Sequence, residues 1–362
     1  MSSEPGERTV DPASDPVTDS ASGSGTGPAP DLASGLASDS GAGPASDPVP
    51  DPGSDQASDP APDPGSDPAS DPATESFVAH RNLLFTVAYE MLGSAADAED
   101  VLQETWMRWV DVDLAEVREH RAYLVRITTR QALNRLRTLS RRKEAYVGPW
   151  LPEPLLTAPD VAQDVELAES VSMALMLVLE TLSPTERAVF VLREVFDVGY
   201  DEIAAAVDKT PAAVRQIAHR ARRHVDARRP RAVVSASETR AALESFQRAL
   251  ATGDLQSLLD VLAPEVVLLS DGGGIKQAAR RPVVGADKVA RFIIGGTGRQ
   301  ESALAVGLTV VNGSPALVIH LDGEIDGVMA VRLEEARITG LYYVRNPEKL
   351  TRVESETELT LR

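Results

Sequence analysis

The chain has 362 residues, a formal net charge of −19 and no cysteine. This length allows two or three domains, and the lack of cysteine excludes disulfides, thiolate-bound metals and cysteine nucleophiles. No apolar run approaches the roughly 18 residues of a membrane-spanning helix, and no secretory signal is visible. We therefore expect a cytoplasmic chain without membrane contact.

Residues 1–75 form an acidic segment built from Asp, Pro, Ala, Ser and Gly. They contain twelve Asp, three Glu and one Arg, which together account for −14 of the net charge. The segment has no aromatic side chain and little apolar volume to bury, and its prolines interrupt helices and sheets. We predict a disordered acidic tail, which acts either as a solubilising leader or as a competitor of nucleic acid for basic surfaces.

The apolar spacing over residues 76–143 predicts three helices. The first ends at Gly93, and Ser94 with Asp97 forms a capping box that starts the second. The outward face of the second helix carries acidic and amide side chains. That face is either solvated or a docking surface for a basic partner.

The third of these helices carries a basic ridge beside its core stripe. Its members repeat at spacings of four, four, three and four residues, which places them on one side of a helix: Arg126, Arg130, Asn134, Arg137 and Arg141. Few acidic residues stand nearby to pair with them. Because such a ridge suits contacts to phosphates and unstacked bases, we favour a nucleic-acid contact over a solvated face.

Residues 144–164 form a linker that contains the sequence WLPEP. Its proline and apolar content predicts neither a helix nor a flexible tether. We expect five residues to dock on the C-terminal part of the chain: Trp150, Leu151, Pro152, Glu153 and Pro154.

Residues 165–230 carry the signals of a helix-turn-helix. Ser183, Pro184 and Glu186 form a capping box with proline at the first helical position. A short helix from about residue 201 to 207 precedes a turn at Asp208, where Asp tolerates the left-handed conformation. Thr210 then caps the second helix of the motif.

The second helix of this motif is the strongest candidate for reading DNA. Residues 210–230 hold six arginines and two histidines against a single acid, Asp226. In a helix-turn-helix the start of the second helix enters the major groove. The candidates for base edges are Ala212, Ala213, Arg215, Gln216 and His219, and those for phosphates are Arg220, Arg222 and Arg223.

Residues 236–352 predict a separate α+β domain. Two helices precede alternating segments near 303–311, 315–321, 325–334 and 337–345, an order that favours a cone with an antiparallel curved sheet. Asp271, Lys276 and His320 are candidates for a pocket, but their spacing is not diagnostic of catalysis or of a metal. The glycines at 272–274 indicate a turn rather than a phosphate loop. Residues 353–362 are expected to be a tail.

Residues 77–229 resemble a sigma factor of the extracytoplasmic function (ECF) group of RNA polymerase sigma factors. Four stretches carry the resemblance: DAEDVLQETWMRW, RAYLVRITTRQALNRLR, LSPTERAVFVLREVFDVGYDEIAAAV and TPAAVRQIAHRAR. The resemblance implies that residues 76–143 are sigma region 2, which melts and captures the −10 promoter element, and that residues 165–230 are region 4, which reads the −35 element. It also implies docking on core RNA polymerase by the helix that carries Asp100, Gln103, Glu104 and Trp106.

Three further motifs are similar to those of the SigJ-like subgroup, whose members carry a C-terminal SnoaL-like domain: WLPEP, DGGG at 271–274 and NPEKL at 346–350. One departure is Ile275, which follows the glycines where a basic residue is expected, with Lys276 one step later. The resemblance thus implies a multidomain chain, in which two all-α sigma domains precede an α+β SnoaL-like domain.

From these features we expect an alternative sigma factor whose C-terminal domain modulates its activity in cis. The expected partners are core RNA polymerase and promoter DNA, with a small ligand of the C-terminal domain as a further candidate. We expect no enzymatic activity, no catalytic residue, no cofactor and no metal. The alternative is a SnoaL-like isomerase or hydrolase, or a ligand sensor, fused to a helix-turn-helix regulator.

Overall fold

The computed structural model describes residues 71–158, 165–228, 234–297 and 303–361. Nearly all of the segment expected to be disordered therefore lies outside the described residues. Its last residues differ from the expectation, because helix α1 (Pro72–Leu92) already begins at Pro72, with Asp71 as N-cap. Proline at the first helical position loses no hydrogen bond, and Ala73 and Phe77 are buried in the helical core.

The first helical group consists of α1, α2 (Ala95–Trp109) and α3 (His120–Glu144), with a short 3-10 turn at Leu114–Glu116. Gly93 ends α1 in the left-handed conformation, and the Ser94 side chain accepts a hydrogen bond from the Asp97 N–H. The three helices pack on one another around buried Leu84, Leu102 and Trp109. The three predicted helices of this group are therefore present. The end of α1 and the start of α2 carry the local signals that define a helix end and a helix start.

The second helical group contains five α-helices: α4 (Val165–Ser170), α5 (Met173–Leu179), α6 (Pro184–Phe190), α7 (Tyr200–Val207) and α8 (Pro211–Asp226). A π-helical turn, Val191–Val195, extends α6. The capping box at Ser183 is formed as predicted. Asp208 ends α7 with φ 55°, which confirms the left-handed turn, and the Thr210 side chain caps α8.

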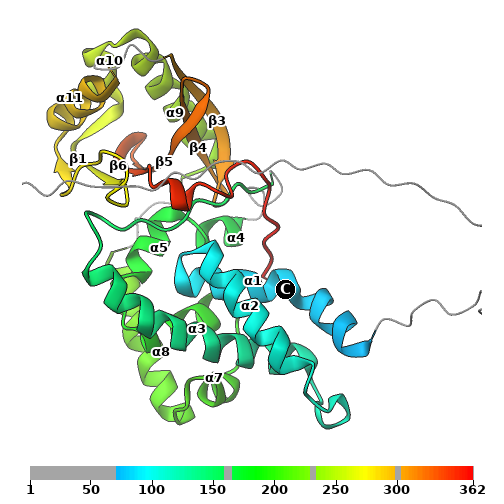
Figure 1. Ribbon diagram of the computed structural model, residues 1–362. Coiled ribbons are helices and arrows are strands. Elements are labelled where there is room, and N and C mark those ends of the chain that lie inside the picture. Colours follow the sequence, from blue (N-terminus) through cyan, green and yellow to red (C-terminus); the bar gives the residue numbers. More distant parts are fainter. Residues whose placement is uncertain (1–70, 159–164, 229–233, 298–302, 362) are drawn as a thin grey trace, which may run out of the picture. The chain divides into compact units, whose positions relative to one another are not determined.

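The C-terminal domain begins with α9 (Ala236–Thr252) and α10 (Leu255–Val261) and continues into a six-stranded sheet. Its strands are β1 (Leu262–Asp271), β2 (Val283–Val284), β3 (Leu304–Val311), β4 (Ser314–Leu321), β5 (Glu324–Glu334) and β6 (Arg337–Val344), in the order β2-β1-β6-β5-β4-β3. The four predicted strand segments match β3 to β6. Figure 1 shows α9 and α11 (Ala286–Thr297) beside this sheet, where they contact β4 and β1 respectively.

The sheet corrects the expectation that all strands are antiparallel, because β1 pairs with β6 in parallel. The other pairs are antiparallel, and Asn312-Gly313 and Asp322-Gly323, all with positive φ, connect β3 to β4 and β4 to β5. Between β1 and β6 the chain passes through α11 and four further strands, and apolar alternation alone does not reveal that change of direction. Helix α11 was also not predicted.

Two of the apolar cores lie apart. One fills the two helical groups, and the other, around Phe246, Leu268 and Leu341, lies between the sheet and α9 to α11. The segment predicted as a C-terminal tail also packs, since Leu359 is buried in the helical core and the Thr360 N–H donates to Thr86 Oγ1 at 3.1 Å. None of the described helices is both long and apolar enough to cross a bilayer.

Candidate nucleic-acid interface

The basic ridge lies on the outer side of α3, opposite its core stripe. The stripe (Val125, Thr129, Ala132, Leu136 and Leu139) is buried, which fixes the rotation of the helix. As a result four ridge residues are exposed: Arg130, Asn134, Arg137 and Arg141. Arg126 is half-buried, and its guanidinium lies 4.5 Å from the centre of the Tyr123 ring.

The ridge charge has little internal compensation. Among the described residues, no carboxylate lies at ion-pair distance from any of its four arginines. Arg130 instead donates to the Ala205 carbonyl of α7 at 2.7 Å, and Arg137 donates to Asn134 Oδ1 at 3.3 Å. By contrast, Arg135, which is off the ridge, pairs with Asp97 and Asp100 at 2.6 Å. The four ridge arginines therefore lack the carboxylate partners that neutralise Arg135.

Helix α8 presents one apolar and one polar side. Val214, Ala218, Ala221 and Val225 are buried, so the rest of the helix surface faces outward. The exposed residues include the base-edge candidates Ala212, Arg215, Gln216 and His219. Ala213 is half-buried, and its N–H donates to the capping Thr210 Oγ1 at 3.2 Å. The predicted reading face is therefore open at the helix start.

The arginines of α8 differ in their surroundings. Arg222 Nε donates to Glu194 Oε2 at 2.8 Å, and Arg220 lies 3.8 Å from Glu186. Arg215 lies over the Tyr200 ring at 5.5 Å. Within the described part of the chain, Arg223 has no carboxylate at ion-pair distance. Arg223 is therefore the phosphate candidate with the most available charge.

The predicted polymerase-binding residues lie along the outer side of α2. Asp100 and Gln103 are exposed and Glu104 is half-buried. Trp106 is half-buried too, with its ring 5.1 Å from that of Phe77. Sequence reasoning missed Met107 of α2 and Val110, the C-cap of that helix, which are 58% and 44% exposed. Their signal was available, because both are apolar residues outside the core stripe.

A buried polar network joins the two helical groups, and sequence reasoning missed it. Glu90 of α1 is fully buried and accepts from Ser170 Oγ at 2.9 Å, while the Arg187 guanidinium donates to the Glu90 carbonyl at 2.8 and 3.0 Å. Arg187 also pairs with Glu180, which bonds to Lys143 at 2.5 Å. Burial raises the pKa of Glu90 to about 8 and lowers that of Lys143 to about 8.

All five linker residues singled out in the sequence are buried or half-buried. The Leu151 N–H donates to Asp271 Oδ2 at 2.9 Å, and the Leu155 N–H donates to Asn312 Oδ1 at 3.0 Å. On the other side, Glu153 Oε2 accepts from the Ala95 N–H at 2.7 Å, at the start of α2. The linker thus contacts both the first helical group and the C-terminal domain.

Asp271 is the point where the three subgroup motifs meet. Its fully buried carboxylate accepts from Tyr146 Oη at 2.6 Å and from Lys349 Nζ at 2.7 Å. The Trp150 ring lies 4.1 Å from Lys349 Nζ and 3.4 Å from Lys143 Nζ. Burial lowers the pKa of Lys349, an effect that the neighbouring Asp271 opposes.

The three candidate pocket residues do not form one site. The Asp271 carboxylate is held by the linker and Lys349, and Lys276 Nζ lies 3.2 Å from Asp326 Oδ1. His320 lies on β4, paired with Ala305 and Ile325 of the neighbouring strands. The described residues contain no group of three His, Asp or Glu side chains placed to hold a metal.

Each of the two helical groups matches a known protein family. Residues 77–142 match Sigma-70 region 2, and residues 172–225 match Sigma-70, region 4. The fold and these matches define a sigma factor of the sigma-70 type.

Comparison with whole chains shows which group of sigma-70-type factors this chain resembles. The chain is 38% identical over 291 residues to the ECF RNA polymerase sigma factor SigJ of Mycobacterium tuberculosis, covering 76% of this chain and 92% of that one. It is 32% identical to the probable ECF RNA polymerase sigma factor SigI of the same species, covering 77% and 94%. The crystal structure of M. tuberculosis SigJ superposes with a TM-score of 0.63 at 33% identity, over 78% of this chain and 99% of that one.

The chain therefore belongs to the ECF RNA polymerase sigma factors. It is an alternative sigma factor that directs promoter-specific transcription, with helical regions 2 and 4 followed by a SnoaL-like domain. The alternative assignment, an isomerase, hydrolase or ligand sensor fused to a DNA-binding regulator, is not favoured.

Proposed function

We propose that regions 2 and 4 divide promoter recognition between opened and paired DNA. The ridge on α3 binds the −10 element as a single strand, through arginines for phosphates and Asn134 for an unstacked base. The exposed start of α8 enters the major groove at the −35 element. The observation that carries this proposal is the uncompensated charge of the α3 ridge beside a neutralised Arg135.

The remaining partner surface is the outer side of α2. We assign core polymerase binding to Asp100, Gln103, Glu104 and Trp106, with exposed Met107 as an apolar neighbour. An acidic and amide face with an apolar centre suits a basic surface of the partner. Because core polymerase and promoter DNA are cytoplasmic in bacteria, we expect the chain to act in the cytoplasm.

The C-terminal domain modulates this activity through contact, without chemistry of its own. Two of its buried carboxylates serve structural bonds, because Asp271 pairs with Lys349 and Asp326 pairs with Arg345. The same domain holds the linker that precedes region 4, at Leu151 and Leu155. Since the linker sets the separation that regions 2 and 4 can reach, its docking restrains their placement on a promoter.

Arg137→Ala tests the single-strand role of the ridge. We expect open-complex formation with core polymerase to weaken by about tenfold, as expected for a charge-assisted phosphate contact. Binding to the fully paired promoter should change by less than about twofold, because paired DNA is held mainly by α8 in this scheme. Permanganate footprinting measures the first quantity and duplex fluorescence anisotropy the second.

The matched control is Arg121→Ala. Arg121 is exposed on the same helix, and around the helix axis it lies on the side opposite the ridge. In the Arg121→Ala variant, open-complex formation and duplex binding should both stay close to those of the unmodified protein. Equal losses for Arg137→Ala in the two assays would refute the division of labour, while a failure of all variants to associate with polymerase would instead point to the assignment of α2.

A further inference from the structure

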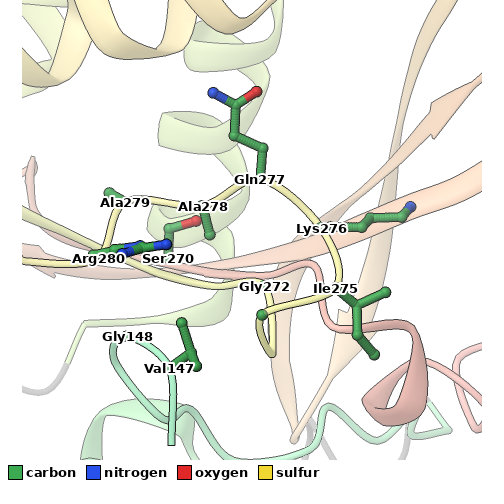
Figure 2. A pocket seen from close by; sticks show the side chains of 11 residues that line it. Val147, Gly148, Ser270, Gly272, Ile275, Lys276, Gln277, Ala278, Ala279 and Arg280 are labelled. Carbon is green, nitrogen blue, oxygen red and sulfur yellow. The ribbon is translucent and has the colours of Figure 1, made fainter. Parts of the chain in front are cut away.

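A cavity lies between the linker and the loop that follows β1. Its volume is about 420 Å³, within the range of about 300–1,000 Å³ typical of small-molecule sites. One wall is formed by Val147 and Gly148, and the other by Ser270 and loop residues between Gly272 and Arg280 (Figure 2). The loop is held in shape by its own bonds, since the Ile275 and Lys276 N–H groups both donate to the Gly272 carbonyl.

The charge of the lining favours an anion. Arg280 is exposed, and no carboxylate in the described part of the chain lies at ion-pair distance from it. None of the lining residues is acidic. The other lining cation, Lys276, is committed to Asp326, and in Figure 2 its side chain extends away from the loop. Arg280 is therefore the cation available to a bound molecule.

The rest of the lining is apolar and small. Val147 and Ile275 are 49% and 59% exposed, and Ala278 and Ala279 leave room beside them. Apolar side chains that remain this accessible beside a polar end suit a ligand with a short hydrocarbon body. The departure from the subgroup motif at Ile275 belongs to this wall, because it places an apolar residue where a basic one was expected.

We propose that this cavity binds a small organic anion, a carboxylate or a phosphate monoester with a compact apolar body. Arg280 pairs with the anionic group. This inference goes beyond promoter recognition and does not depend on it. Since the two walls belong to the linker and to the C-terminal domain, the anion binds the docked linker better than the released one and so stabilises docking.

The test uses the full chain and four probes that share one ring: benzoate, phenyl phosphate, benzyl alcohol and benzylammonium. Thermal unfolding is followed at constant ionic strength as each probe is titrated. We expect benzoate or phenyl phosphate to raise the Tm saturably, while the alcohol and the cation do not. The anion that works identifies the ligand class as a carboxylate or a phosphate ester.

Two variants localise the effect. Arg280→Gln should weaken the binding of the active anion by about tenfold or more. Arg281→Gln is the matched control, because Arg281 is exposed next to Arg280 but does not line the cavity. It should bind within about twofold of the unmodified chain.

Three results would overturn the proposal: no saturable shift with either anion, an unchanged affinity in Arg280→Gln, or an equal loss in Arg281→Gln. Because the readout needs neither polymerase nor DNA, a failure here leaves the promoter assignment untouched. Arg280 is exposed and has no ion pair with a described carboxylate, so Arg280→Gln should fold like the unmodified chain, and a loss of binding is then not a loss of folding.

Discussion

At the residue scale, the arginines of α8 show that exposure alone does not make a phosphate contact. Arg222 and Arg223 are neighbours and both are exposed. Arg222 makes two bonds to the Glu194 carboxylate, which raises the pKa of its guanidinium, whereas no described carboxylate pairs with Arg223. To bind a phosphate, Arg222 must give up a bond that Arg223 does not have, so the two should differ in their contribution to DNA binding.

Arg223→Ala should reduce the slope of log affinity against log salt concentration by about one, because one phosphate contact is lost. Affinity should fall to a similar extent for all sequences. Arg222→Ala is the control, for which we expect a clearly smaller change in slope. A salt series with a −35 duplex and a scrambled duplex gives both quantities. An unchanged slope for Arg223→Ala would remove Arg223 from the interface.

At the scale of elements, the linker is an ordered strand-like segment. Isolated bridges pair Leu156 with Val311 and Thr157 with Thr357, and Leu151 is fully buried among residues of the sheet. Glu153 caps α2 from outside the helix, although burial raises its pKa against that interaction. The described part of the linker therefore takes its conformation from contacts with the first helical group and the C-terminal domain.

Asp271→Asn should loosen this docking. The change leaves Lys349 buried without its carboxylate, which typically costs about 3–5 kcal/mol. Trp150 fluorescence, taken as the difference between each protein and its Trp150→Phe derivative, should shift toward the spectrum of a solvated indole. Asp287→Asn, which breaks an exposed pair with Arg291, is the control. A Trp150 spectrum that persists in Asp271→Asn, and also after deletion of residues 236–362, would exclude docking on the C-terminal domain.

At the scale of the whole molecule, the fully buried carboxyl group of Glu90 lies at the contact between the two helical groups. Glu90 has a pKa of about 8 in the folded chain because of burial, against its ordinary value of 4.5. One of its oxygens, Oε2, has no hydrogen-bond partner. The folded state thus binds a proton that the unfolded state releases above pH 4.5, so stability falls as the pH rises toward 8 and levels off above it.

Glu90→Gln should remove this part of the pH dependence. The two proteins should have similar free energies of unfolding near pH 4.5, and the variant should gain relative to the unmodified chain up to pH 8, by at most about 1.4 kcal/mol per pH unit. Urea unfolding at several pH values measures the difference. Glu75→Gln, at an exposed site on the same helix, should keep the original slope. A slope that survives in Glu90→Gln would show that Glu90 is ionised in the folded chain.

The sequence by itself determined the features that depend on neighbours within a few residues. Capping at Ser94, Ser183 and Thr210, the left-handed turn at Asp208, and the rotation of α3 and α8 all follow from spacings of three or four residues. The arginine ridge was predictable for the same reason, because a buried stripe on a helix fixes which residues face outward.

The tertiary structure decided what depends on residues far apart in the chain. The parallel pairing of β1 with β6, the contact of Glu90 with Ser170 and Arg187, and the convergence of Tyr146 and Lys349 on Asp271 join segments separated by dozens of residues. In the sequence alone, nothing distinguishes these polar residues from ordinary surface residues. Only packing removes water from them and selects their partners, and the cost of an unpaired buried charge makes those partners specific.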